Sequence, residues 1–160
     1  LGQVEQAIQV IQQSLQMAQA YHRQETELQC LLSLGEAYLA QGDCESAEKV
    51  ARQLIESSAG VSHRLAGARL ILGRCWLTRN NPMQALTILE AGLLDAQASY
   101  SKMMILRLHA ALSQVASHPA IAQVHRRIAA ELVQQIADAL DDKALRVTFL
   151  QSPLARLVRE

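Results

Sequence analysis

Two related segments decide the fold of this chain: LLSLGEAY at residues 31–38 and RLILGRCW at residues 69–76. Both place Leu-Gly shortly before an aromatic residue, which is Tyr38 in the first segment and Trp76 in the second. An alanine follows nine positions after each aromatic residue, at Ala47 and Ala85. Self-similarity at a fixed spacing indicates an internal repeat.

Turn-forming residues between the periodic segments predict where the helices begin and end. The breakers Gly42-Asp43 and Asn80-Asn81-Pro82 separate apolar runs. The aspartate and the second asparagine there are predicted N-caps, and the proline suits a first helical turn. Gly60 is predicted to end a helix in the left-handed conformation. Apolar periodicity then predicts helices at about residues 3–22, 25–40, 43–58, 62–79, 82–96, 99–117, 119–140, 143–151 and 153–159. No segment alternates with period two at strand length, so the predicted fold class is all-α.

The spacing also predicts how the helices pair. Second helices of three successive pairs are marked by Gly2/Ala7, Gly42/Ala47 and Asn80/Ala85. A glycine inside a helix costs about 1 kcal/mol relative to alanine, so Gly35 and Gly73 need a structural reason. We expect them to let each first helix approach its second helix closely, at Ala47 and Ala85.

This pattern of a large residue, Leu-Gly, an aromatic residue and a small residue in the next helix resembles the tetratricopeptide repeat. The resemblance implies an α-α superhelix, a solenoid of antiparallel helix pairs, forming a single domain over residues 1–160. The units recur after 40 and 38 residues, from Ala7 to Ala47 to Ala85, against about 34 in the standard repeat. Such long units resemble the C-terminal arrays of bacterial signal-transduction ATPase regulators of the maltose-regulon-activator type, and of related multidomain kinases and cyclases.

That resemblance implies a protein–protein interaction or sensor module of a multidomain bacterial signalling or transcriptional regulator, and not an enzyme. A small-molecule inducer-binding repeat domain is the alternative function. The missing initiator methionine leads us to expect that the 160 residues are a fragment of a larger protein.

Composition argues against several partners. Lys plus Arg total 15 and Asp plus Glu total 15, so the excess of positive charge typical of nucleic-acid binding is missing. No apolar run approaches the roughly 18 to 20 residues that cross a bilayer.

The three cysteines, Cys30, Cys44 and Cys75, are odd in number and irregularly spaced. That usage is typical of a reducing compartment, so we expect a cytoplasmic protein.

Few residues in the sequence are candidates for catalysis or for binding a metal or cofactor. The five histidines form no i, i+4 pair with an acidic companion, so we predict solvated or capping histidines and no metal site. The cysteines form no CxxC pair and are predicted to be structural thiols. Asp141-Asp142 is expected to cap the short helix that follows. Because phosphate-binding and dinucleotide-binding loops are missing, we predict no catalytic residue and no cofactor.

The resemblance implies that first helices line a binding groove. In this register the lining residues are Gln29, Leu32, Glu36 and Leu39 from one unit and Gly67, Leu70, Arg74 and Leu77 from the next. Family members that grip a peptide carboxylate use Lys and Asn there, whereas this chain has Leu32 and Glu36, so that activity is not expected. An apolar stripe with one acid and one base suits an amphipathic helix, a peptide or a domain of the same parent chain. We expect its leucines to be exposed enough to tolerate glutamate. The alternative is that the superhelix itself covers them.

The last residues, 143–160, are predicted to cap the array, because a solenoid must cover its last apolar face. The apolar side is expected to comprise Leu145, Phe149, Leu150 and Leu154, with Phe149 buried. The side facing water is expected to comprise Lys143, Arg146, Arg156 and Arg159.

Overall fold

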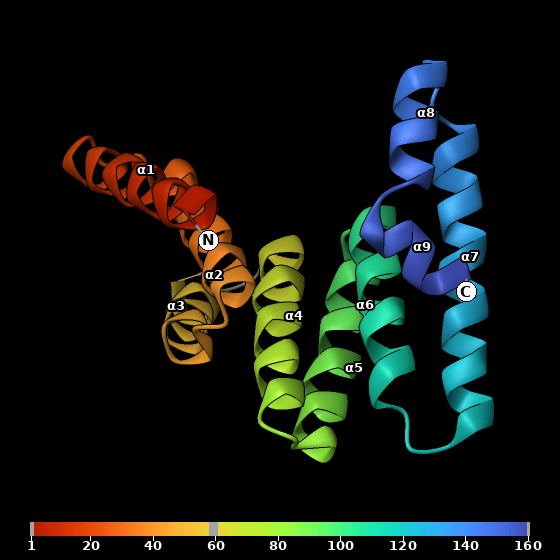
Figure 1. Cartoon of the computed structure of the whole chain (residues 1–160). Coiled ribbons are helices and arrows are strands. Elements are labelled where there is room, and N and C mark those ends of the chain that lie inside the picture. The colour runs from red at the N-terminus through yellow and green to blue at the C-terminus, as the bar shows by residue number, and fades with distance from the viewer. Residues whose placement is uncertain (1, 58–60, 160) are drawn as a thin grey trace.

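The computed structural model describes residues 2–57 and 61–159, and within these ranges all regular structure is helical (Figure 1). The helices are α1 (Gly2–Ala20), α2 (Gln24–Gln41), α3 (Cys44–Ser57), α4 (Ser62–Thr78), α5 (Pro82–Ala98), α6 (Lys102–Val115), α7 (Pro119–Asp138), α8 (Lys143–Leu150) and α9 (Pro153–Arg159). The all-α prediction is confirmed. The predicted turn at Gly60 lies outside the described residues.

The helix ends follow the predicted capping. The Asp43 carboxylate accepts a hydrogen bond from the Ser46 N–H at 3.0 Å. Asn81 accepts from Gln84 N–H at 3.4 Å, with Pro82 in the first turn of α5. Asp142 caps α8 by accepting from two backbone N–H groups at 2.7 and 3.1 Å. Each side chain therefore satisfies donors that a helix start leaves unpaired.

Each helix packs on its neighbours in the chain, and the first helices also contact one another. α2 touches α4 and α4 touches α6, so α2, α4 and α6 form one layer (Figure 1). Three clusters of buried residues follow one another along the array, and the last includes residues of α9. This arrangement is a solenoid of helix pairs, as predicted.

The two interior glycines do make room for side chains, but not at the predicted alanines. A Cβ on Gly73 would lie 2.5 Å from Leu89 Cδ2. Gly73 therefore approaches α5, the predicted partner helix, but at Leu89, one turn after the predicted Ala85. At Gly35 the predicted partner helix is wrong, because the space is filled by Ile71 of α4, 2.7 Å from a built Cβ. One repeat of 38 residues earlier, the position equivalent to Leu89 holds Ala51. Its side chain is too short to fill the space beside Gly35.

The C-terminal helices differ partly from the prediction. α9 packs on α6 and α7, with Ala155 and Val158 buried. We expect Leu145 on the apolar side, but it is 59% exposed because, among the helices that the structure describes, α8 contacts α7 and α9 alone. Phe149 is half-buried rather than buried. Arg146 is also half-buried, and its guanidinium donates to the carbonyl of Leu140 at 2.8 Å.

Candidate functional site

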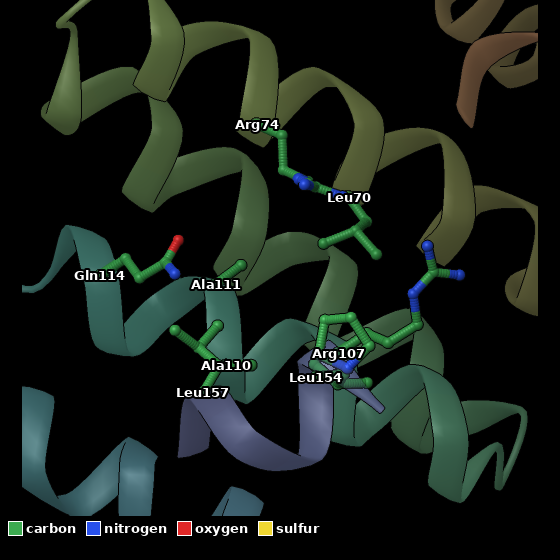
Figure 2. A pocket seen from close by; sticks show the side chains of 9 residues that line it. Leu70, Arg74, Arg107, Ala110, Ala111, Gln114, Leu154 and Leu157 are labelled. Carbon is green, nitrogen blue, oxygen red and sulfur yellow. The ribbon is translucent and has the colours of Figure 1, made fainter. Parts of the chain in front are cut away.

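A hollow of about 440 Å³ lies where α9 crosses the layer of first helices (Figure 2). Its lining comes from three helices: Leu70 and Arg74 on α4, Arg107, Ala110, Ala111 and Gln114 on α6, and Pro153, Leu154 and Leu157 on α9. We call it the α4–α6–α9 groove. Apolar side chains dominate it and a few polar groups lie at its edge, which is the usual composition of a binding site.

The two arginines of the groove are in different electrostatic environments. Arg107 forms an ion pair with Glu36 of α2, with 2.7 Å between Nη2 and Oε1. Arg74 is exposed, and within residues 2–57 and 61–159 no carboxylate lies within ion-pair distance of it. The Gln114 amide, also exposed, adds a donor and an acceptor. The groove therefore offers an unmatched positive charge beside an apolar surface.

The predicted lining residues do not all reach this groove. Only Leu70 and Arg74 line it. Leu70 is 3% exposed, so the expectation that it is exposed is wrong: it belongs to a core cluster formed by α4, α5 and α6. Leu32 packs on Gly67, where its Cδ1 lies 2.7 Å from a built Cβ. Leu39 and Leu77 are half-buried against core clusters, and Gln29 is exposed. A binding role for Gln29, Leu32, Leu39 and Leu77 stays a prediction.

Sequence reasoning missed the groove residues of α6 and α9. α6 lacks the Leu-Gly signal, so the register could not be extended to Arg107 and Gln114. The position of α9 depends on packing between elements that are distant in the chain, which no local pattern reports. The predicted acid, Glu36, is matched by Arg107, a pair that spans 71 positions of sequence.

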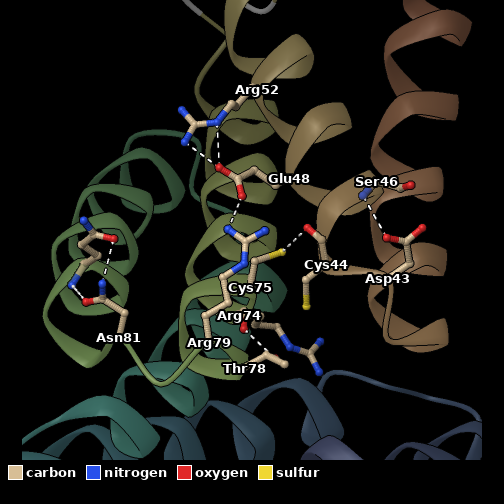
Figure 3. Close-up of polar contacts among 11 residues, drawn as sticks. Asp43, Cys44, Ser46, Glu48, Arg52, Arg74, Cys75, Thr78, Arg79 and Asn81 are labelled. Atoms are coloured by element: carbon tan, nitrogen blue, oxygen red, sulfur yellow. Dashed lines mark hydrogen bonds and ion pairs between the residues drawn. The ribbon is translucent and has the colours of Figure 1, made fainter.

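A cluster of polar side chains lies between α3 and α4 (Figure 3). Glu48 accepts from Arg52 at 2.7 Å and also pairs with Arg79, whose guanidinium lies 5.4 Å from the centre of the Trp76 ring. The hydrogen bond from Arg52, followed by the pairing with Arg79, lowers the pKa of Glu48 against the opposing effect of burial. These ion pairs join α3 to the C-terminal end of α4.

Two of the three cysteines, Cys30 and Cys75, have the properties of structural thiols. Cys75 is buried, and its Sγ lies 3.6 Å from the carbonyl oxygen of Cys44 (Figure 3). Burial raises the pKa of Cys75 to about 12, with a smaller contribution from Cys44. Burial also raises the pKa of Cys30. Because the thiolate is the reactive form, Cys30 and Cys75 are poor nucleophiles.

The histidines agree only partly with the prediction. His118 caps α7, as expected of a capping histidine. His109 and His125 instead form an imidazole pair between α6 and α7, with 2.8 Å between their Nδ1 atoms. His109 is 6% exposed, so the prediction of solvated or capping histidines is wrong for it. Burial, and then the neighbouring His125, lower the pKa of His109 to about 4.

The part of the chain that the structure describes contains few other candidates for a binding or catalytic site. Across residues 2–57 and 61–159, no three His, Cys, Asp or Glu side chains gather as metal ligands would. In the same residues, no helix combines the length and apolar character that crossing a membrane requires. Asp142 is occupied as the cap of α8.

Comparison with known proteins supports the fold. The family described as Tetratricopeptide repeat matches residues 1–59, which include α1 to α3. A crystal structure of nearly identical TPR-like repeats, assigned to a kinesin light chain of Podosopora anserina, is similar with a TM-score of 0.59 and 21% identity. The match covers 99% of this chain and 74% of that chain. No curated protein matches in sequence. The chain is thus a TPR-like solenoid, and TPR repeats are in general modules that bind proteins.

Proposed function

We propose that the α4–α6–α9 groove binds a segment of a partner protein that carries apolar side chains beside an acidic group. The environment of Arg74 is the observation that carries this proposal. Its side chain is an exposed cation beside the apolar hollow, and it has no ion-pair partner among the described residues. A guanidinium presents five N–H donors in a planar fork that matches a carboxylate.

The apolar part of the groove determines the rest of the ligand. Leu154 and Leu157 of α9 face Leu70 across the hollow (Figure 2). Apolar side chains spaced three or four residues apart on a helix would reach this surface together. Gln114 can pair with a polar group or with peptide backbone at the edge. A short amphipathic acidic helix fits this arrangement.

A charge-reversal experiment tests the proposal. We would measure, by fluorescence anisotropy, the binding of labelled helical peptides that carry leucines at helical spacing and either glutamates or lysines beside them. The acidic peptides should bind about two to thirty times more tightly, because an ion pair with an exposed arginine contributes about 0.2 to 1 kcal/mol and a lysine at the same place is repelled by a similar amount. Arg74→Glu should remove the preference. Arg126→Glu, the same change on an exposed part of α7, is the matched control.

Two results would contradict this function. Equal binding of the acidic and basic peptides would show that Arg74 does not select the ligand. An equal loss in the Arg74→Glu and Arg126→Glu variants would show that only the overall charge of the protein matters.

We also propose that the parent protein is a cytoplasmic multidomain regulator in which this segment binds a protein or transmits ligand state. The support is the 38- to 40-residue unit, which is longer than the standard repeat. The parent gene should then encode a phosphate-binding loop, GxxxxGK followed by Ser or Thr, in residues that precede this segment. A parent chain without a nucleotide-binding domain would count against this assignment.

The volume of the groove favours one alternative ligand, a small apolar carboxylate acting as an inducer. About 440 Å³ falls within the roughly 300 to 1,000 Å³ typical of small-molecule sites. A medium-chain fatty acid at millimolar concentration should then raise the melting temperature of the protein but not that of Arg74→Glu. No shift in either protein would leave the peptide as the ligand.

A further inference from the structure

Side chains of α2 and α6 meet over the surface of α4, one turn before the part of α4 that lines the α4–α6–α9 groove. At Gly67 a built Cβ would lie 2.7 Å from Leu32 Cδ1 of α2 and 3.6 Å from Met104 Cε of α6. One turn further along α2 and α6, Glu36 and Arg107 form an ion pair. A glycine at position 67 leaves room for this approach. The fold thus brings the Glu36 carboxylate to Arg107.

The position of Glu36 gives the two arginines of the groove different environments. Arg74 and Arg107 both line the groove, and Figure 2 shows Leu70 between their guanidinium groups. Glu36 lies on α2, outside the lining, and its Oε1 is 2.7 Å from Arg107 Nη2. Among the described residues, no carboxylate lies within ion-pair distance of Arg74. Two cations and one carboxylate leave one positive charge unbalanced.

A ligand carboxylate would gain less at Arg107 than at Arg74. At Arg107 it must displace Glu36, so one ion pair breaks for each one that forms, and the displaced carboxylate repels the new one. At Arg74 no ion pair is lost. Given that the groove binds an acidic segment, as in the proposed function, we propose that Glu36 is a specificity-determining residue. It occupies Arg107 and restricts the groove to the recognition of one acidic group.

Peptides that differ by a single acid test this inference. The starting peptide is helical, with leucines at helical spacing and one glutamate. In each of the other peptides a second glutamate replaces a glutamine three, four or seven residues to either side, positions that share a helix face with the first glutamate. Fluorescence anisotropy gives each Kd.

The second glutamate should matter only when Glu36 is neutral. In the unmodified protein it should change the Kd by less than about 1.5-fold for every spacing. In Glu36→Gln at least one of the two-glutamate peptides should bind about two to five times more tightly than the starting peptide, because Arg107 is then free to pair with it. The Glu36 side chain is 41% exposed, so this variant should stay folded by circular dichroism.

Two further variants assign the gain to Arg107. Adding Arg107→Gln to Glu36→Gln should abolish the gain from the second glutamate. Glu45→Gln, the same loss of charge at an exposed residue of α3, is the matched control. Its ratio of the two Kd values should equal that of the unmodified protein.

Three results would overturn the inference. The first is a second glutamate that strengthens binding to the unmodified protein as much as to Glu36→Gln. The second is no gain in Glu36→Gln at any spacing. The third is a gain that survives Arg107→Gln. The proposed function is judged separately, by whether the unmodified protein prefers glutamate peptides to lysine peptides through Arg74. Failure of every peptide to bind would refute both.

Discussion

Replacing Gly73 by alanine should destabilise the solenoid, although alanine is the better helix former. A Cβ at this position would lie 2.5 Å from both Cγ and Cδ2 of Leu89, whose side chain is fully buried. Relieving contact with a branch-point carbon requires the whole leucine to move, and such overpacking costs about 1 to 3 kcal/mol. The gain in helix propensity returns about 1 kcal/mol. We expect a net loss of up to about 2 kcal/mol in the free energy of unfolding.

Gly35 provides the matched comparison, because the same atom would meet only the end of a flexible side chain. The nearest atom there is Ile71 Cδ1, at 2.7 Å, and the other Ile71 carbons are 3.7 Å away. A small rotation of Ile71 relieves this contact, so Gly35→Ala should change stability by less than about 1 kcal/mol. Urea unfolding measured by circular dichroism would give both values. In thermal melts each kcal/mol corresponds to about 2 to 4 °C.

A double-mutant cycle tests whether the lost stability comes from contact between residue 73 and Leu89. Leu89→Ala alone should cost about 2 to 5 kcal/mol because it leaves a cavity. In a chain that already carries Gly73→Ala, the Leu89→Ala change should cost less. The methyl group of the new alanine at position 73 then occupies part of the cavity that the leucine leaves. We expect a coupling energy of about 1 to 2 kcal/mol between the two sites. Additive losses, or equal losses for Gly35→Ala and Gly73→Ala, would refute the close-approach explanation.

Three further predictions concern the core, the histidine pair and the C-terminal helices. Leu70→Glu should unfold the array at room temperature or cost at least about 3 kcal/mol, as it buries a charge, whereas Arg74→Glu should change urea stability by less than about 0.5 kcal/mol. His109 has a folded-state pKa of about 4, below its usual value near 6.5, so the unfolded chain binds the proton first as pH falls. Stability contributed by His109 should be complete above about pH 6.5 and lost towards pH 4, by up to about 3 kcal/mol. His109→Gln should show a smaller loss over the same pH range, and identical pH profiles would contradict this assignment. Truncation after Asp142 removes the buried Ala155 and Val158 and should lower the melting temperature by several degrees; an unchanged melt would show that α8 and α9 do not stabilise the array.

Local features of the fold could be read from the sequence because their causes are local. Asp43, Asn81 and Asp142 cap helices through backbone groups two or three residues away. Apolar spacing within each segment reports which side of a helix is buried. The repeat register then placed Gly73 correctly against its second helix, because that helix is the next in the chain.

Features that join distant segments could not be read in this way. The imidazole pair joins His109 and His125 across the α6–α7 turn, and neither has a distinctive neighbour in sequence. The groove requires α9 to fold back onto α6, which depends on the packing of Ala155 and Val158. Exposure of Leu70 was overestimated because a seven-residue spacing identifies a face of α4 but not the helices that cover it.

Mapping the ligand directly would test the central claim that the α4–α6–α9 groove is the binding surface. Methyl NMR of the leucines, recorded while the tightest acidic amphipathic peptide is added, reports which side chains the ligand contacts. We predict the largest shifts at Leu154 and Leu157, smaller ones at Leu70, and none at the exposed Leu94 of α5. Shifts confined to Leu94 or to α1, with Leu154 and Leu157 unmoved, would contradict the account.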